Sequence, residues 1–584
     1  MTQPLRCTLS TLCLLVLCGG VRAQWTDDAA ANTPVSTAAS DQGQPKLVPA
    51  EGGGVWASWF DGIGSGWDVR LQRLGIGGVA QLGAGGVLVA DRSFSSTQDY
   101  GLAAGNDGSA LLAYRDDDGS GVFIAASKVQ ADGTLAWGAG GVALTGTAAF
   151  VAAPGIAGTD DGRALVGWAQ DSGVMLQRLD ADGDLVGGPI AFAPGVGSYS
   201  VADMHAVGDD VIVSFVHQLG GFGSPRHLLA QKIGAAGNLA WGAGHVSVFD
   251  GGSLQFGNFP DFSSDGAGGA VFSWYDTASP QLQCFAQRVL SNGTEAWAHN
   301  GVAVSTDATH LRVAPWASHD AASAETIVTW VELNGAQSQA GVYAQKLDAA
   351  GARQWSDAGA LLVPLGSDGI SAPLNMRLGA QSLVAWVQSS GFGQDQLLGV
   401  LLDGSGAIVG GSVPLATTAS SKSRLSMTLT GAGHAALAWS DKRSDDGDIY
   451  AQNVNADGSL GPRWQDLGGG TEGLDGVPLL TCMGPLNAGS PLGAELSHAQ
   501  PGGLALLWVS FASAPINIFG GTLHTLPVGF ELLIVNDGSG GFAASTPFPA
   551  GVPSGAEMVF QFLCQDDAAP FNKTLTDGLL GTTP

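Results

Sequence analysis

One motif recurs along most of the chain and limits what the chain can fold into. Its fullest copy is Tyr343-Ala344-Gln345-Lys346-Leu347-Asp348-Ala349-Ala350-Gly351, followed by Trp355. The glycine of the motif recurs at Gly78, Gly133, Gly183, Gly237, Gly293, Gly351, Gly406 and Gly458. Neighbouring copies lie between 50 residues (Gly133 to Gly183) and 58 residues (Gly293 to Gly351) apart. This period suits one small four-stranded sheet and is too short for an independent domain, so it predicts a closed or stacked array.

A second landmark follows the same period. Before each glycine, a short apolar run ends on an aromatic residue, at Trp59, Tyr114, Trp168, Phe215, Trp274, Trp330, Trp386 and Trp439. These runs are β-branched or aromatic and are bounded by Gly, Asp or Asn, which is typical of buried strands. A further strand follows each glycine, and a fourth precedes the aromatic run near a loosely recurring proline (Pro45, Pro154, Pro260, Pro315, Pro373). Four strands in each of the eight units predict an all-β chain that forms an eight-bladed β-propeller.

A tryptophan stands four residues after the glycine in several units. It occurs as Trp137, Trp241, Trp297 and Trp355, and Trp464 takes a similar place in the eighth unit. With the Leu347-Asp348-Ala349 turn, this pattern resembles the tryptophan-docking motif of quinoprotein-type eight-bladed propellers. The resemblance implies that indoles wedge between neighbouring sheets and bury much apolar area there. The chain has no vicinal cysteines, so the resemblance is not extended to a quinone cofactor.

The first 23 residues have the pattern of a signal peptide. Arg6 precedes the apolar run Leu12-Cys13-Leu14-Leu15-Val16-Leu17-Cys18, and Val21-Arg22-Ala23 offers a cleavage site. The prediction is therefore an exported protein, extracellular or periplasmic. Just after the cleavage site, Pro34-Val35-Ser36 resembles the strand that follows each tryptophan. We expect it to pair into the last unit and close the ring, because closure removes exposed sheet edges.

The repeat stops near residue 480. The predicted organisation is a signal peptide at 1–23, a propeller at 24–480 and a separate module at 481–584. In Gly489-Ser490-Pro491, Phe560-Gln561-Phe562 and Leu575-Thr576-Asp577-Gly578-Leu579 the last part resembles the C-terminal β-sandwich of many secreted bacterial repeat proteins. That resemblance implies an accessory, docking or anchoring module. Cys482 and Cys564 could form a disulfide bond there, and Cys284 is expected to be a buried apolar side chain.

The balance of charge excludes some partners. The chain has 23 Lys and Arg against 51 Asp and Glu, a formal net charge of −28 at pH 7. A nucleic acid or an anionic membrane would be repelled. An uncharged glycan, a cation or a cell-surface protein fits better, and the protein is expected to be a monomer without a membrane span.

One set of polar residues is a candidate binding site. Two positions after each strand-ending aromatic residue stand Asp61, Asp116, Gln170, His217, Asp276, Glu332, Gln388 and Asp441. Equivalent positions of all blades point to one end of a propeller, so the acids and His217 could meet a cation or sugar hydroxyls. The alternative is that each side chain caps its own turn by hydrogen bonds to the local backbone.

Calcium is the one cofactor with a candidate site, at Asp180-Ala181-Asp182-Gly183-Asp184, where Asp180, Asp182 and Asp184 bring carboxylates together. A hairpin turn without metal explains the same residues, because sister turns such as Gly234-Ala235-Ala236-Gly237 lack carboxylates.

The sequence carries no recognisable catalytic motif. It has no HExxH metal motif, no Gly-x-Ser-x-Gly elbow and no phosphate-binding loop. The favoured interpretation is a secreted, non-catalytic propeller for binding or surface assembly. The alternative is a propeller hydrolase or lyase that acts on carbohydrate through acids of the polar set.

Overall fold

The computed structural model describes residues 24–64, 66–83, 85–93, 100–147, 150–278, 282–474 and 476–584. The predicted signal peptide lies outside this part. In these ranges the regular secondary structure is strand, apart from two short 3-10 helices, η1 (Glu51–Gly53) and η2 (Pro570–Asn572). None of the helices in the part described is long and apolar enough to cross a membrane. The prediction of an all-β chain is confirmed.

Within the described ranges, eight sheets have four antiparallel strands each. The first four in chain order are β2 (Gln42–Pro49), β3 (Val55–Ile63), β4 (Gly66–Leu74), β5 (Val87–Ala90); β6 (Gly101–Ala104), β7 (Ala110–Asp117), β8 (Val122–Val129), β9 (Val142–Ala143); β10 (Val151–Gly158), β11 (Ala164–Gln170), β12 (Gly173–Leu179), β13 (Leu185–Phe192); and β14 (Ser198–Val207), β15 (Asp210–Gln218), β16 (Arg226–Ile233), β17 (Val246–Phe249). The next three are β18 (Phe262–Ser264), β19 (Ala270–Asp276), β20 (Gln283–Val289), β21 (Val302–Ala303); β22 (Leu311–Asp320), β23 (Glu325–Leu333), β24 (Ala340–Leu347), β25 (Ala360–Gly366); and β26 (Gly369–Leu378), β27 (Gln381–Ser389), β28 (Asp395–Leu402), β29 (Ile408–Ser420). The last joins β30 (Lys422–Leu429), β31 (Ala435–Asp441) and β32 (Asp448–Val454) to the N-terminal β1 (Thr33–Ser36).

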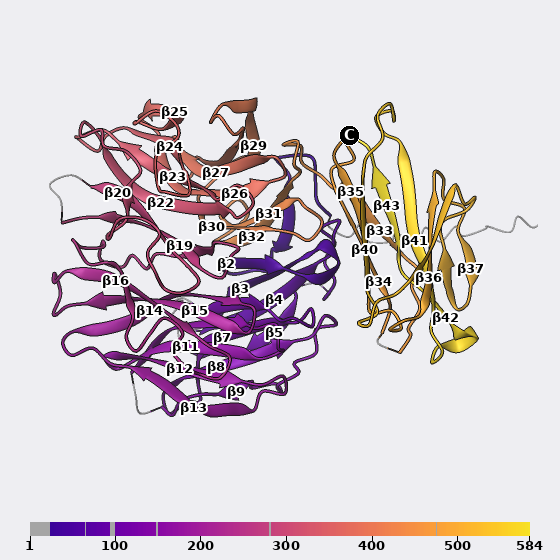
Figure 1. Ribbon diagram of the computed structural model, residues 1–584, viewed down its shortest axis with the longest axis horizontal. Helices are drawn as coiled ribbons and strands as arrows, with labels where there is room; N and C mark the ends of the chain where they lie inside the picture. The colour runs from indigo at the N-terminus through magenta and orange to yellow at the C-terminus, as the bar shows by residue number, and fades with distance from the viewer. Residues whose placement is uncertain are drawn as a thin grey trace, which may run out of the picture.

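The first strands of the sheets β2, β6, β10, β14, β18, β22, β26 and β30 form the inside of a closed ring. Each contacts the first strand of the next sheet, and β30 of the last sheet contacts β2 of the first. Figure 1 shows the indigo first sheet beside the orange last one. The arrangement is a β-propeller, in which every sheet covers its apolar faces with its neighbours.

The ring is closed by the N-terminal strand, as the sequence predicts. β1 pairs antiparallel with β32, with Thr33 opposite Ala451 and Pro34 opposite Tyr450. The segment before β1 is held by Arg443, whose Nη1 donates to the backbone oxygens of residues 30 and 31 at 3.2 and 3.1 Å. Strands from the two ends of the ring therefore share one sheet.

The two landmarks of the repeat meet between neighbouring sheets. Trp241 packs on Gly293 of the next sheet, and its Nε1 donates to Ser291 O at 3.0 Å. Trp297 packs on Gly351 in the same way and donates to the backbone two residues before that glycine at 3.1 Å. A Cβ on Gly293 would lie 2.7 Å from the Trp241 ring, and the φ of this glycine is +85°. Only glycine meets both requirements.

The last of these contacts comes from a residue that the repeat did not reveal. Trp25 is 1% exposed, packs on Gly78 of the first sheet and donates from Nε1 to Ile76 O at 3.0 Å. The sequence assigned the tryptophan of the eighth unit to Trp464. That assignment is wrong, because Trp464 begins β33 and packs in the C-terminal core.

The C-terminal part has its own sheets and core. A six-stranded sheet contains β33 (Trp464–Gly468), β43 (Gly578–Thr582), β41 (Glu557–Gln565), β36 (Leu504–Ser510) and β39 (Phe530–Val535), with β42 (Lys573–Leu575) paired to β41. A three-stranded sheet contains β34 (Leu479–Met483), β35 (Pro491–Ser497) and β40 (Phe542–Pro547), and β37 (Ile516–Ile518) pairs with β38 (Gly521–Leu523). One hydrophobic core draws on both larger sheets. Since β33 pairs with β43, this fold takes in residues before the predicted boundary at 481.

The cysteines of this core are not bonded to each other. Cys482 and Cys564 are both free and buried, as is Cys284 in the ring. Burial raises the pKa of the Cys564 thiol to about 12. The disulfide that the sequence allowed between Cys482 and Cys564 is therefore absent, and the two thiols act as apolar packing groups.

The C-terminal sheets sit against one end of the ring (Figure 1). β34 contacts η1, which joins β2 to β3, and Glu51 of η1 accepts a hydrogen bond from Ser497 Oγ at 3.2 Å. We call this the module end of the ring. The hairpins between second and third strands lie at the other end, because antiparallel strands reverse direction at each turn. We call that the open end.

Replacing Trp25 with alanine tests the closure of the ring. The free energy of unfolding should fall by about 3–5 kcal/mol, the usual loss for a buried tryptophan. Trp297→Ala removes the equivalent contact inside the ring and is the matched comparison. Equilibrium denaturation followed by tryptophan fluorescence measures both. A loss below about 1 kcal/mol for Trp25→Ala would contradict its role in closure.

His434 predicts a pH dependence of the same region. It lies edge-on to Trp25, with ring centroids 6.1 Å apart, and burial lowers its pKa to about 4. In the unfolded chain the His434 imidazole binds a proton near pH 6.5, whereas in the folded protein it does so only near pH 4. The contribution of neutral His434 to the free energy of unfolding is therefore fully present above pH 6.5 and is lost as the pH falls toward 4. The loss should reach about 3 kcal/mol, from about 1.4 kcal/mol per pKa unit.

Denaturation at several pH values would measure this loss. His434→Gln, which does not titrate, should be less stable at pH 7 but should lose less stability on acidification. Equal slopes for the two proteins would exclude His434 as the cause.

Candidate ligand cavity at the centre of the ring

The polar set predicted from the sequence lies at one end of the ring. Each member stands at or near the end of the second strand of its sheet, at the open end, and all eight therefore share one face. The members are Asp61, Asp116, Gln170, His217, Asp276, Glu332, Gln388 and Asp441. The shared face follows from the repeat, but it does not by itself make the side chains available to a ligand.

Half of the set binds the indole that defines it. Residues two apart on a strand lie on the same face, so the acceptor reaches the tryptophan of its own strand. The bonds are Trp168 Nε1 to Gln170 Oε1 at 3.1 Å, Trp330 to Glu332 Oε2 at 2.6 Å, Trp386 to Gln388 Oε1 at 3.3 Å and Trp439 to Asp441 Oδ2 at 2.8 Å. The spacing of aromatic and polar residue in the sequence therefore marks a buried structural pair.

Most of the acids in this set also have cationic partners inside the protein. Asp61 is 4% exposed and forms an ion pair with Arg70, and Arg312 donates to Glu332 at 3.0 Å. Burial raises the pKa of Asp441, but its hydrogen bonds from Arg443, Ser420 and Trp439 outweigh burial and hold the pKa below its usual value.

The other three members of the set bind nearby backbone. Asp116 accepts from the amide of Asp117, Asp276 from that of Ser253, and the Nε2 of His217 lies 2.8 Å from Val196 O. Asp276 also accepts from the amide of Ala278 at 2.9 Å, so Asp116 and Asp276 cap their own turns as the capping alternative requires. The contacts with Ser253 and Val196 instead join segments that lie 23 and 21 residues apart in the chain. A binding role for Asp61, Asp116, His217, Asp276, Glu332 and Asp441 stays a prediction.

The calcium candidate is a hairpin turn between β12 and β13. Asp180 Oδ1 accepts from the amides of Asp182 and Asp184 at 3.0 and 2.9 Å. Asp348 caps its turn in the same way, accepting from Ala350 and Ala352, although that turn has no other carboxylate. Within the described ranges, no group of three or more His, Cys, Asp or Glu side chains is arranged to hold a metal. The arrangement therefore fits turn capping better than metal ligation.

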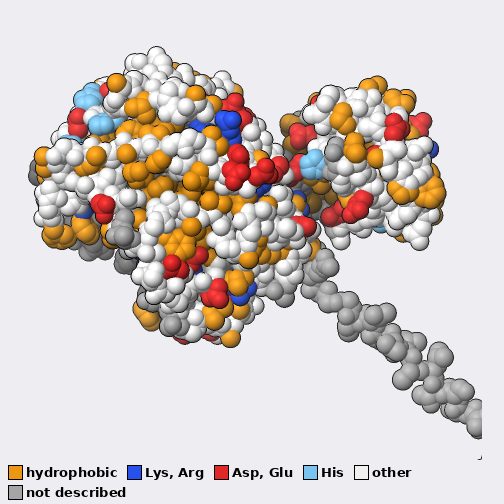
Figure 2. All heavy atoms as spheres, turned by 90° about the horizontal axis from the view of Figure 1, so that it is seen from below, with side chains coloured by type: hydrophobic (Ala, Val, Ile, Leu, Met, Phe, Trp, Pro, Cys, Tyr) orange, Lys and Arg blue, Asp and Glu red, His pale blue; other side chains and the backbone are white. Residues whose placement is uncertain are grey.

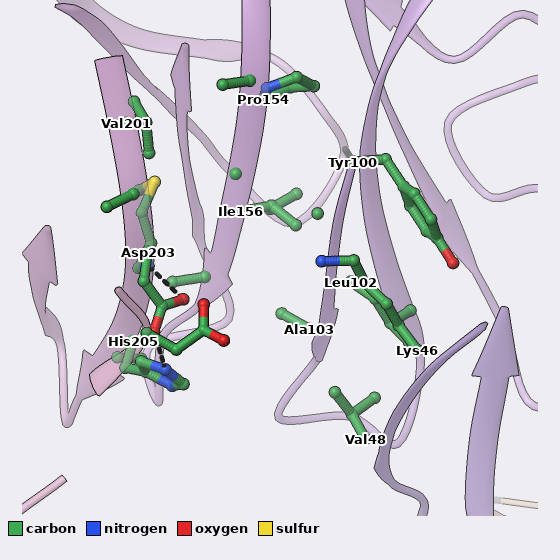
Figure 3. A pocket seen from close by; sticks show the side chains of 18 of the residues that line it. Lys46, Val48, Tyr100, Leu102, Ala103, Pro154, Ile156, Val201, Asp203 and His205 are labelled. Atoms are coloured by element: carbon green, nitrogen blue, oxygen red, sulfur yellow. Dashed lines mark hydrogen bonds and ion pairs between the residues drawn. The ribbon is translucent and has the colours of Figure 1, made fainter. Parts of the chain in front are cut away.

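A cavity of about 600 Å³ lies at the centre of the ring. It is lined by the first strands of four consecutive sheets and by the segment that leads into a fifth, at Lys46, Val48, Pro49, Tyr100–Ala104, Ala152–Gly158, Ser200–Ala206, Phe259 and Asp261. Most of its wall is apolar, with Val48, Leu102 and Ile156 among the side chains that face it in Figure 3. The size is typical of sites for small organic ligands.

The first strands that line the cavity are bulged. Register shifts in β2 and β10 coincide with Gln44 and Ala153, whose φ values are 55° and 47°, each directly before a proline. Ala314 and Ala372 repeat this geometry in β22 and β26. Bulges redirect side chains, and a positive φ in a residue with a side chain is strained. The loosely recurring proline of the sequence therefore marks the bulge beside the ring centre.

The polar groups of the cavity centre on Asp203 and His205 of β14. Asp203 Oδ2 lies 2.8 Å from His205 Nε2 and accepts from the amide of Phe262 at 3.0 Å (Figure 3). Burial raises the pKa of Asp203, but the His205 charge and hydrogen bond outweigh it and the pKa is lowered. Burial lowers the pKa of His205, but the Asp203 carboxylate outweighs it and the pKa is raised. The two groups form an ion pair when His205 is protonated, and 47% of the His205 side chain remains exposed.

The repeat pattern of the sequence does not reveal this pair. Asp203 and His205 lie in Val201-Ala202-Asp203-Met204-His205, where the alternation of a strand puts both on one face. The signal was present, but it occurs once and not in each repeat. On the opposite side of the cavity, Lys46 Nζ lies 5.4 Å from the centre of the Tyr100 ring.

No protein-family model and no curated protein matches the sequence. Among solved structures, the polysaccharide lyase Uly1 aligns with a TM-score of 0.39 and 11% identity, over 75% of this chain and 98% of the lyase. The GH43 endo-arabinanase from Bacillus licheniformis aligns with a TM-score of 0.26 and 15% identity, over 44% of this chain and 98% of the enzyme. Prolyl oligopeptidase B from Galerina marginata aligns with a TM-score of 0.36 and 10% identity, over 78% of this chain and 55% of the peptidase. These likenesses are too distant to assign an activity to this chain.

Calcium should leave the stability of the protein almost unchanged, because a ligand stabilises only in proportion to its preferential binding of the folded state. Thermal melts in EDTA and in millimolar Ca²⁺, at matched ionic strength, check this. Asp348→Ala is the control for loss of a turn cap. A rise of several degrees in Ca²⁺ that Asp182→Ala abolishes would make the Asp180–Asp184 turn a calcium site.

Proposed function

We propose that this chain is an exported, non-catalytic binding protein that holds a neutral saccharide in the cavity at the ring centre. The observation that carries the proposal is the Asp203–His205 pair, exposed to a cavity of about 600 Å³ with apolar walls. Export rests on the predicted signal peptide at 1–23.

The chemistry of the cavity suits a sugar. Partly exposed apolar side chains such as Val48 and Leu102 can pack against the C–H face of a pyranose ring, and the carboxylate and imidazole can bind hydroxyl groups. When His205 is protonated, its charge offsets that of Asp203, so the pair can offer hydrogen bonds without requiring a ligand ion.

The charge of the whole protein narrows the class of ligand. With a formal net charge of −28, the protein repels anionic polymers at low salt. A neutral oligosaccharide experiences no such repulsion. This favours uncharged sugars over nucleic acids and acidic glycans.

The same pair supports one alternative, a carbohydrate hydrolase or lyase. A histidine hydrogen-bonded to an aspartate can transfer a proton to or from a bound substrate. We favour binding alone, since the chain carries no recognisable catalytic motif.

A glycan array followed by calorimetry tests both functions on the full mature chain. We expect binding to a neutral oligosaccharide without release of reducing ends or unsaturated products. Asp203→Asn and His205→Gln should each weaken binding about tenfold or more, since a hydrogen bond to a charged group contributes about 1.5–3 kcal/mol. Asp276→Asn, in the polar set outside the cavity, should bind like the wild type.

Two outcomes would overturn the proposal. Binding that survives both cavity variants would place the ligand elsewhere, and the absence of binding to any glycan would remove the saccharide class. Turnover that Asp203→Asn and His205→Gln abolish would establish the enzymatic alternative.

A further inference from the structure

The six-stranded sheet of the C-terminal part ends on an uncovered strand. β39 reads Phe530-Glu531-Leu532-Leu533-Ile534-Val535, with five apolar residues out of six and no proline. Among the described residues, β39 pairs with β36 only, and it is the last strand of its sheet. Its outer edge therefore presents backbone N–H and C=O groups that can pair with another strand.

The sheet face beside this edge is apolar and exposed. Leu533 is 64% exposed and Val535 is 65% exposed, and the register places them opposite Leu506 and Leu504 of β36. Leu504 is itself 46% exposed. We call these four residues the β36–β39 patch. Hydrophobic side chains at the surface of the smaller, C-terminal lobe are visible in Figure 2.

The second sheet of the same part ends on an edge of a different kind. β40 is also largely exposed, but it carries Ala543, Ala544, Ser545 and Thr546 and ends in Pro547. Proline is one of the usual protections of an edge strand against pairing. β39 lacks that protection, although the two strands belong to one compact unit with one core.

A second copy of β39 fits this edge. Two antiparallel copies related by a two-fold axis pair residues on the same sheet face, and the register proposed here places Leu533 opposite its own copy. In that register Glu531 lies opposite Val535, and Leu532 lies opposite Ile534. No two like charges face each other, and the two β36–β39 patches join into one apolar surface.

We propose that β39 is an assembly edge through which two copies of this chain pair into a continuous sheet. Main-chain hydrogen bonds along the edge give affinity, and side-by-side contacts of Leu533 and Val535 with the second copy of β39 give specificity. The proposal is independent of the ligand in the ring cavity and differs from the monomer that the sequence suggested. The net charge of −28 on each copy opposes association, so dimerisation should strengthen as salt screens the repulsion.

Sedimentation velocity of the mature full chain over a range of concentration and salt tests the pairing. We expect a monomer–dimer equilibrium that shifts toward the dimer at higher salt. Leu533→Lys places two lysines face to face at the two-fold axis and should leave a monomer. Ser545→Lys adds the same side chain to the edge of β40 and should dimerise like the wild type.

Two further measurements keep the test decisive. Thermal melts should show that both lysine variants stay folded, since both positions are exposed. Leu533→Cys should form a disulfide-linked dimer under mild oxidation, whereas Ser545→Cys should not. A wild type that stays monomeric at high concentration and high salt, or a Leu533→Lys variant that dimerises normally, would overturn the proposal.

Discussion

The structure depends on a repeated contact between an indole and a glycine of the next sheet. Trp241 on Gly293 and Trp297 on Gly351 each combine apolar burial with an indole hydrogen bond to the backbone. The glycine has no room for a Cβ, so it cannot change to a larger residue while the tryptophan stays in place. Where the tryptophan is missing, a smaller apolar side chain makes a contact at the same place. In the first unit this side chain is Leu82, which lies against Gly133. One local rule, applied sheet after sheet, sets the approach of neighbouring blades.

If the ring did not close, the first and the last sheet would each have one apolar face without a neighbouring sheet. Closure draws on the N-terminal segment twice, since β1 completes the last sheet and Trp25 supplies the indole for Gly78. Arg443 fixes the segment between them. Pairing residues near 33 with residues near 450 costs loop entropy only once, because the sheets between them are already ordered by their own short hairpins. The N-terminal residues are thus structural and not a linker.

The ring and the C-terminal sheets use their exposed groups differently. In the ring, polar side chains at the strand ends form hydrogen bonds with indoles and ion pairs with arginines. The exposed Asp203–His205 pair faces the central cavity. In the C-terminal part, one edge is blunted by Pro547 while β39 and its apolar patch remain uncovered. The proposed binding inside the ring and the proposed assembly through the C-terminal part therefore use separate surfaces and can be tested separately.

The sequence by itself determined the period, the four strands of each unit, the all-β class and the pairing of β1, because these follow from local patterns of apolar residues and turns. It also predicted that tryptophans dock between sheets. Only the tertiary structure shows which glycine each indole contacts, and that Trp25 packs in the ring whereas Trp464 packs in the C-terminal core. It also shows that Glu332 and Asp441 accept hydrogen bonds from the tryptophans of their own strands. The cavity belongs to this second class. Its walls come from residues 46 to 261, and no local pattern records which side chains a closed ring brings together.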